Sequence, residues 1–196
     1  MRLAINLGLI AVIALLVWML VSSIQEPIAF KAAKEARHSV VEERLKKIRS
    51  AQELHREITG KFAGDFDSLS YVIRTGKVQI ISVYGNPDDP DSDGTDIRYD
   101  TTYVAAMKKI EELEIGNLDS LRYVPFGDGA TFSIQADTLT YQSTLVNVVE
   151  VGTPTKIFMG KYKDPYYSRY DNSYDPEKVI KFGNMGAPNL SGNWER

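Results

Sequence analysis

An acidic segment in the middle of the chain carries the residue types that bind a hard cation. Asp89-Pro90-Asp91-Ser92-Asp93-Gly94-Thr95-Asp96 places carboxylates at alternate positions and then a glycine. Ca²⁺ takes roughly six to eight oxygen ligands, and a glycine permits the turn that brings them together. With Asp89 as the first position of a calcium loop, Asp100 falls at the last ligand position. The pattern predicts a calcium site with these ligands: Asp89, Asp91, Asp93, Thr95 and Asp100.

The alternative is that this segment is a solvated acidic turn. A glutamate usually fills the last ligand position of a calcium loop, and Asp100 has a shorter side chain. Residues 78–83 are β-branched and alternate, which predicts a strand where an EF-hand would have a helix. Asp, Pro, Ser and Gly are also the ordinary residues of loops. Both interpretations stay open, and we expect no cofactor other than Ca²⁺.

The patterns that usually support catalysis are missing from the sequence. The chain has no Cys, which argues against thiol catalysis and zinc-type sites. His38 and His55 lie on one predicted helix without the spacing of a metal pair. No Gly-x-Ser-x-Gly motif occurs, and Gly152, Gly160 and Lys161 lack the spacing of a P-loop. We therefore expect a protein that is not an enzyme, with an anchored hydrolase whose acid/base pair lies among the many carboxylates as the alternative.

The N-terminal segment is the strongest signal in the sequence. Residues 3–24 are apolar and uncharged. As a helix they would extend about 33 Å, which is enough to cross the hydrocarbon layer of a membrane. The run is longer than the apolar core of a secretory signal, so we favour an uncleaved single-pass anchor. Val21-Ser22-Ser23 is a tolerable cleavage site, which keeps a cleaved signal as the alternative.

The side of the membrane on which the remaining residues lie has two interpretations. Lys31, Lys34 and Arg37 follow the apolar run, and the positive-inside rule would place them in the cytoplasm. The short N-terminal tail with Arg2 is instead typical of the charged region of an export signal. We favour the second interpretation, and expect a head outside the cytoplasm.

The charge balance limits the partners that the head can have. The chain carries a formal net charge of −3, and removing residues 1–27 takes away one basic and one acidic residue. A nucleic-acid-binding domain needs a basic face, so no nucleic acid is expected as a partner. The remaining length suits a single domain with its own core.

A second helix is expected to continue from the apolar run. Residues 28–58 contain no Gly or Pro, and Gly60 ends the helix. Apolar side chains recur in it at three- and four-residue steps: Val41, Leu45, Ile48, Ala51, Leu54 and Ile58. This stripe is typical of a helix that packs on a core, while a coiled-coil seam would need a longer regular repeat. Residues 28–40 are thinly apolar and are interpreted as a stalk.

The sequence of the head changes from helical to β-rich along its length. A short helix over 65–76 is expected first, then a strand over 78–83 and a helix over 102–114. Short strands are expected later, at 121–126, 131–136, 139–141 and 145–151. Gly127-Asp128-Gly129 predicts a hairpin turn between the first two of these. Helices followed by strands favour an α+β fold with a small antiparallel sheet.

One helical turn through Phe158 is predicted next, and the tail from Lys161 is expected to be mostly loop. This tail concentrates five tyrosines: Tyr162, Tyr166, Tyr167, Tyr170 and Tyr174. Tyrosine offers rigid contact area for protein or glycan recognition. The interpretation that we favour is structural, with the rings packing the loop over the sheet.

This layout resembles bacterial pseudopilins and type IV pilins, in which a membrane helix continues into an amphipathic helix packed on an antiparallel sheet. The segments that carry the resemblance are 48–55, with its continuation 60–69, and the closing Gly192-Asn193-Trp194. Uncharacterised bacterial single-pass envelope proteins with this exit segment and a Gly-Asn-Trp-Glu ending are closer still. The resemblance implies an acidic calcium loop, since major pseudopilins hold calcium in one.

The chain departs from pilins at their processing site. Pilins are cut after a Gly that precedes Phe or Met, with a Glu five residues further on. Here Gly8 precedes Leu9, and Ile13 occupies the glutamate position. Cleavage by a prepilin peptidase is therefore not expected.

Three regions follow: a transmembrane anchor over 1–27, an amphipathic helix and stalk over 28–60, and an α+β extracytoplasmic head over 61–196. The resemblance implies a bacterial inner-membrane protein with a periplasmic head. We expect a non-enzymatic, pilin-like envelope protein that makes protein–protein contacts in a surface or secretion assembly. Its expected partners are the membrane through residues 3–24, other envelope proteins and further copies of itself. The alternative is an extracytoplasmic module that binds a ligand or calcium.

Overall fold

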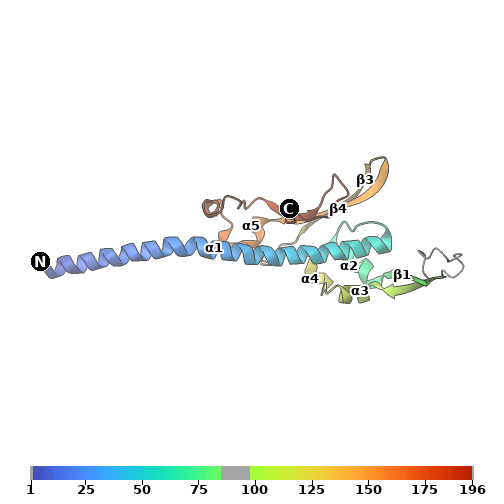
Figure 1. Cartoon of the computed structure of the whole chain (residues 1–196), viewed down its shortest axis with the longest axis horizontal. Coiled ribbons are helices and arrows are strands. Elements are labelled where there is room, and N and C mark those ends of the chain that lie inside the picture. The colour runs from blue at the N-terminus through green and yellow to red at the C-terminus, as the bar shows by residue number, and fades with distance from the viewer. Residues whose placement is uncertain (1, 85–97, 196) are drawn as a thin grey trace, which may run out of the picture.

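A single helix, α1 (Arg2–Thr59), runs through most of the length of the molecule (Figure 1). The computed structural model describes residues 2–84 and 98–195. Pro27 lies inside α1 and does not end it. The helix ends at Gly60, whose positive φ of 79° is open to glycine without steric cost. The Gly60 amide donates to the Arg56 carbonyl across 2.7 Å. The predicted continuation from apolar run to second helix is thus confirmed.

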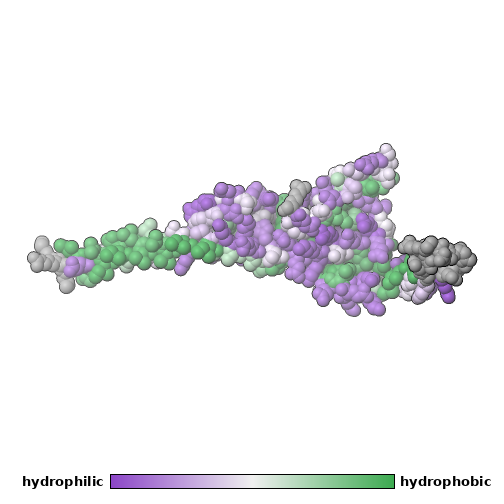
Figure 2. Space-filling model, in the orientation of Figure 1, coloured by the Kyte–Doolittle hydropathy of each residue, from purple (hydrophilic) through white to green (hydrophobic). Residues whose placement is uncertain are grey.

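The first part of α1 is apolar and stands clear of the head. It is long and apolar enough to cross a membrane, and none of its most apolar stretch is buried. Figure 2 shows it as a hydrophobic arm that projects from a mostly hydrophilic body. It is therefore a candidate membrane anchor.

The second part of α1 forms the centre of the head. Val41, Leu45, Ile48, Ala51 and Leu54 are all buried, as their spacing predicts. Sheet and tail lie on one side of this part, and α2, α3, α4 and the first hairpin lie on the other (Figure 1). The head is therefore α+β and is built around the helix.

Residues 28–40 are not the bare stalk that the sequence suggested. Phe30 is fully buried, because the C-terminal tail packs against it. Further along, Lys34 is bonded to Asp171, and Arg37 donates to the Phe158 carbonyl across 2.5 Å. The head therefore begins almost directly after the apolar run, with Tyr170 bonded to Glu26.

The chain turns back after α1 through a buried polar contact. The Gln52 amide nitrogen donates to the Ala63 carbonyl across 3.0 Å, and the Ala63 amide donates to Gln52 across 2.9 Å. Helix α2 (Phe66–Thr75) follows, with Asp65 accepting from the Ser68 amide at its N-terminus. This capped helix matches the prediction for 65–76.

A two-stranded antiparallel sheet comes next. Strand β1 (Lys77–Tyr84) confirms the predicted strand, and β2 (Arg98–Ala105) pairs with it along its whole length. The predicted helix over 102–114 is wrong in its first part, because residues 102–105 belong to β2. Helix α3 is shorter, Ala106–Glu112, and its Ile110 is buried. The helical spacing of Val104 was outweighed by its cross-strand pairing with Val78.

The predicted strand over 121–126 is also wrong. Helix α4 (Leu118–Leu121) occupies its start, capped by the Asn117 side chain. Only the isolated bridge between Tyr123 and Thr131 has a β character. The Gly127-Asp128-Gly129 turn is nevertheless present, because the Val124 amide donates to the Ala130 carbonyl across it. Leu118 and Leu121 are buried, so their burial in a short helix replaced strand pairing.

The second sheet has the order β3-β4-β5 and is antiparallel throughout. Its strands are β3 (Ser133–Tyr141), β4 (Thr144–Pro154) and β5 (Val179–Gly183). Gln142 and Ser143 join the first two with positive φ values of 47° and 66°, the pattern of a two-residue hairpin turn. The sequence predicted β3 as two strands and missed β5.

Between β4 and β5 the chain forms three short helical segments. They are α5 (Thr155–Phe158), as predicted, and the 3₁₀ helices η1 (Gly160–Tyr162) and η2 (Pro165–Tyr170). These segments return toward the anchor end of α1 before β5 re-enters the sheet (Figure 1).

Candidate functional site

The predicted calcium ligands fall mostly outside the described residues. Asp89, Asp91, Asp93 and Thr95 lie in 85–97, while Asp100 is exposed on β2 opposite Ser82. No cluster of three or more His, Asp or Glu side chains that could hold a metal occurs within 2–84 and 98–195. The calcium site therefore stays a prediction.

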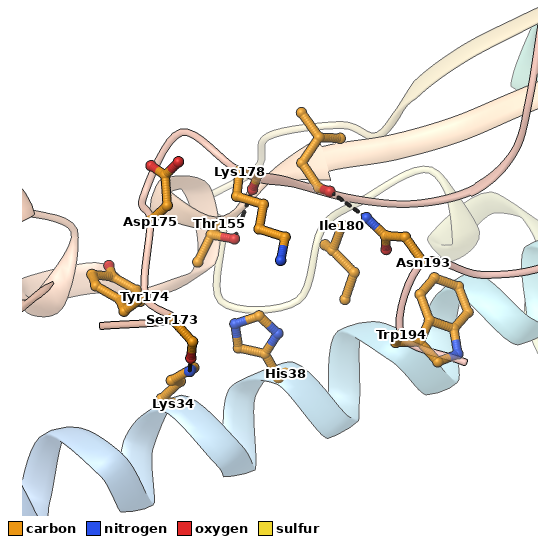
Figure 3. Close-up of a pocket in the computed structure, with 11 residues that line it drawn as sticks. Lys34, His38, Thr155, Ser173, Tyr174, Asp175, Lys178, Ile180, Asn193 and Trp194 are labelled. Carbon is orange, nitrogen blue, oxygen red and sulfur yellow. Dashed lines mark hydrogen bonds between the residues drawn. The ribbon is translucent and has the colours of Figure 1, made fainter. Parts of the chain in front are cut away.

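A cleft of about 170 Å³ lies between α1 and the C-terminal part of the chain (Figure 3). It brings together residues of α1, the start of α5, the loop before β5 and the closing segment. Its walls include the side chains of six residues: Lys34, His38, Thr155, Lys178, Asn193 and Trp194. No sequence pattern indicated this cleft, because its residues lie up to 160 positions apart and each is unremarkable on its own.

His38 is the ionisable group at the centre of this cleft. Its ring packs edge-on against buried Phe158, with centroids 5.0 Å apart. Burial, together with the positive charges of Lys34 and Lys178, lowers the pKa of His38 to about 4. The imidazole is therefore neutral at pH 7. Its Nε2 atom is buried and has no hydrogen-bond partner in the described part of the chain.

Most other polar groups around the cleft hold the fold together. Lys34 Nζ donates to Asp171 across 2.6 Å, and this bond holds the pKa of the Asp171 carboxyl well below its usual range. Thr155 Oγ1 donates to the Lys178 carbonyl across 2.8 Å, and Asn193 Nδ2 donates to the Val179 carbonyl across 2.8 Å. These contacts fix the walls of the cleft and leave few groups free for a ligand.

Among the described residues, two buried nitrogens of the cleft have no hydrogen-bond partner, His38 Nε2 and the Trp194 indole nitrogen, and the Lys178 ammonium group points toward His38. The Trp194 nitrogen is buried without a hydrogen-bond partner among residues 2–84 and 98–195. An indole and an ammonium group are hydrogen-bond donors, and a neutral imidazole can also donate. In Figure 3 the Lys178 ammonium group points toward His38, whereas the Trp194 nitrogen points away from both, so Lys178 and His38 are the pair that suits a small acceptor such as a carboxylate.

The tyrosines of the tail pack on α1, not over the sheet as expected. Phe30 contacts the rings of Tyr162, Tyr167, Tyr170 and Tyr174, at centroid distances of 5.6, 5.4, 6.2 and 5.0 Å. The Tyr174 hydroxyl donates to the Tyr162 carbonyl across 2.5 Å, and burial raises the pKa of Tyr174 to about 12. The cluster is thus structural for most of its members.

The β1–β2 hairpin presents a surface that the sequence did not reveal. Ile81, Val83, Tyr99 and Tyr103 share one face, because Val83 pairs with Tyr99 and Ile81 lies two residues before Val83. Each of these four side chains is between 46% and 66% exposed. We call this set the hairpin face. The hairpin face depends on alternate residues of both strands. The sequence predicted a helix over 102–114, so it did not reveal the face.

The hairpin face and the apolar arm lie at opposite ends of the molecule (Figures 1 and 2). His55 lies near the hairpin end of α1, buried, with its Nδ1 2.8 Å from the Lys61 carbonyl oxygen. The two histidines therefore belong to separate surroundings, as their sequence spacing implied. Comparison with known proteins found no matching family model, no matching curated protein and no matching solved structure.

Proposed function

We propose that the chain is a non-enzymatic, single-pass membrane protein whose head makes protein–protein contacts in an envelope assembly, in the manner of pilin-like proteins. Residues 3–24 are the anchor, and the head lies outside the cytoplasm. The observation that carries the proposal is the exposed hairpin face at the end of the head opposite the apolar arm.

Without a membrane, the apolar surface of residues 3–24 would face water. From Ile5 to Ile24, the large apolar side chains of α1 are between 42% and 70% exposed. Burying apolar area is favourable by about 25 cal/mol per Å², so an arm of this length is stable when it is surrounded by lipid. The short N-terminal tail with Arg2 supports the orientation with the head outside.

The β1–β2 hairpin is separate from the three-stranded sheet, and this supports a role as a contact surface. A two-stranded sheet is marginal by itself, and β1 and β2 form a sheet of their own. Val78 on the inner face of β1 is buried against the head, whereas the hairpin face on the outer side is open. A partner that covers Ile81, Val83, Tyr99 and Tyr103 would bury apolar and aromatic area of the kind found at interface centres.

A site-specific photo-crosslinker in intact cells tests this proposal. The photoreactive analogue benzoylphenylalanine in place of Tyr99 is expected to give a discrete protein adduct. The same group in place of Glu111, an exposed residue of α3, is expected to give none. Loss of the Tyr99 adduct in the Ile81→Lys variant would tie the contact to the hairpin face. A chain that stays uncrosslinked at both positions would contradict the proposal.

The cleft around His38 supports a second candidate function, an extracytoplasmic ligand-binding module. The Lys178 ammonium group beside His38 suits a small carboxylate, and the probe is acetate. With Trp18→Phe as background, Trp194 is the sole tryptophan, so its fluorescence reports on the cleft. Acetate is expected to change that fluorescence, and Lys178→Met is expected to weaken the effect. An unchanged signal across the titration would contradict this function.

The same candidate function could be calcium binding, for which the sequence predicts five ligands: Asp89, Asp91, Asp93, Thr95 and Asp100. Calorimetry of the full chain with Ca²⁺ tests it, and the double variant Asp91→Ala with Asp93→Ala is the matched control. Binding heat in the parent that disappears in the double variant is the expected result. Absence of heat in the parent would leave the solvated turn as the correct interpretation.

A further inference from the structure

The tyrosine-rich helix η2 is held against α1 directly beside the end of the apolar run. The Tyr170 hydroxyl donates to the Glu26 carboxylate across 2.7 Å, and Arg169 lies 3.6 Å from the same carboxylate. Glu26 stands two residues after Ile24, the last residue of the apolar arm. This part of the head, although it comes late in the sequence, is thus the part nearest to the anchor.

The short distance along α1 from the apolar run to Glu26 determines the depth of η2 relative to the bilayer. A helix rises about 1.5 Å per residue, so Glu26 lies about 3 Å beyond Ile24. The polar headgroup layer on each side of a bilayer is several ångströms thick, about 5 to 8 Å. With residues 3–24 across the hydrocarbon, Glu26 and the residues bonded to it fall within that layer.

The side chains of η2 are those that suit such a layer. Tyr166 is 50% exposed, and the Arg169 guanidinium stacks on the rings of Tyr166 and Tyr170, 3.5 and 4.5 Å from their centroids. Tyrosine is enriched at membrane–water interfaces, because its ring is apolar and its hydroxyl is polar. Arginine likewise keeps its stem in apolar surroundings and its charge among polar groups.

An exposed apolar residue on α1 gives independent support. Ile28 is 63% exposed although it lies beyond the apolar run, beside Pro27 and Glu26. In water the exposed part of this side chain would face solvent, which is unfavourable for apolar surface. In the interfacial region the same side chain would face the boundary with the acyl chains, where apolar groups are favoured.

We propose that η2 is an interfacial foot, a second contact of the head with the lipid headgroups beside the anchor. The Tyr166 hydroxyl and the Arg169 guanidinium donate hydrogen bonds to lipid phosphate and ester oxygens. This inference rests on the membrane anchor of the proposed function, and is independent of the hairpin face. Its consequence is that the head has a fixed side toward the bilayer.

The experiment uses the full chain in lipid nanodiscs of phosphatidylcholine and phosphatidylglycerol. Because the chain has no Cys, each introduced cysteine is a unique labelling site. A bimane label is attached in the variants Tyr166→Cys, Ile13→Cys and Glu111→Cys, and lipids with a nitroxide at the headgroup or in the acyl chain act as quenchers. We expect headgroup quenching at 166, acyl-chain quenching at 13, and no quenching at 111.

The three positions separate failure of the foot from failure of the anchor. Quenching at 13 without quenching at 166 would overturn the foot and leave the anchor intact. No quenching at 13 would overturn both the anchor and the foot. A second arm replaces Tyr166 with benzoylphenylalanine, which keeps an aromatic ring there. A phospholipid adduct at 166, absent at 111, supports the foot, whereas a protein adduct in its place would overturn it.

Discussion

The two ends of the head use aromatic residues in opposite ways. Near the apolar arm, tyrosines of the tail surround Phe30, and Tyr170 is joined to Glu26 of α1 by a hydrogen bond. At the far end, Tyr99 and Tyr103 stand on a two-stranded hairpin with their rings exposed. The packing partners at each end explain the difference. Near the apolar arm the returning tail packs directly on α1, whereas the β1–β2 hairpin forms a sheet of its own at the opposite end of the head (Figure 1).

The aromatic side chains at the two ends therefore differ in what they contribute to folding stability. Side chains buried at the anchor end contribute to the free energy of unfolding. Side chains exposed at the hairpin end contribute little to it and are available to a partner. Substitutions at the two ends should therefore separate stability from partner binding.

The largest effect is expected for Phe30→Ala. Removing a buried phenylalanine costs about 3–5 kcal/mol of folding stability, and here it would also release the ring cluster of the tail. Urea unfolding of the chain in detergent measures the loss, and limited proteolysis within 161–178 reports release of the tail. Val40→Ala, on an exposed side chain of the same helix, is the matched control and should change neither. Equal losses in the two variants would refute the role of Phe30.

The next largest effect is expected for Gln52→Leu. The substitution leaves the Ala63 amide and carbonyl buried without partners, at about 1–3 kcal/mol for each group. Urea unfolding is again the measurement, with Gln79→Leu on exposed β1 as the control. A stable Gln52→Leu variant would show that the turn after α1 is held by its apolar contacts alone.

A smaller effect, dependent on pH, is expected from His38. The pKa of His38 is about 4 in the folded chain, below the value of 6.5 for a free histidine. Between these values the unfolded chain binds more protons, so folding stability falls as pH drops from about 6.5 toward 4. The slope of unfolding free energy against pH should decrease in His38→Gln. An unchanged slope would show that His38 is protonated equally in both states.

The smallest effect on stability is expected at the hairpin face. Ile81→Lys and Val83→Lys alter exposed side chains, so the unfolding free energy should change by no more than about 0.5 kcal/mol. The same variants should abolish the photo-crosslink from position 99, while Glu111→Lys leaves it intact. A large loss of stability would mean that the hairpin face belongs to the core of the head.

The sequence predicts those parts of the fold that depend on local pattern. The apolar run, the buried stripe of α1, the capped helix α2 and the strand β1 all follow from spacing and from terminal residues such as Asp65 and Gly60. The predictions fail where pairing between strands, and not local spacing, determines the secondary structure. Residues 102–105 have helical spacing but pair with β1, and β5 is short and forms by pairing with β4.

The surfaces proposed for function were not accessible from local pattern. The cleft needs His38 of α1 beside Lys178 and Trp194 of the tail, and no spacing rule joins such positions. The tyrosines of the tail were conspicuous in the sequence, yet their target, Phe30, lies more than a hundred residues earlier in the chain. The one site that local pattern did indicate, around Asp91 and Asp93, lies outside the described residues.

Helix α1 continues past Pro27 without a break, so a tilt at one end of the helix displaces the other end. From Ile24 to Thr59 the helix extends about 52 Å, so a change in tilt of about 10° moves its far end by about 9 Å. Spanning helices tilt in response to the thickness of the surrounding bilayer. With residues 3–24 across a bilayer, as we propose, a thicker or thinner membrane would displace the β1–β2 hairpin sideways.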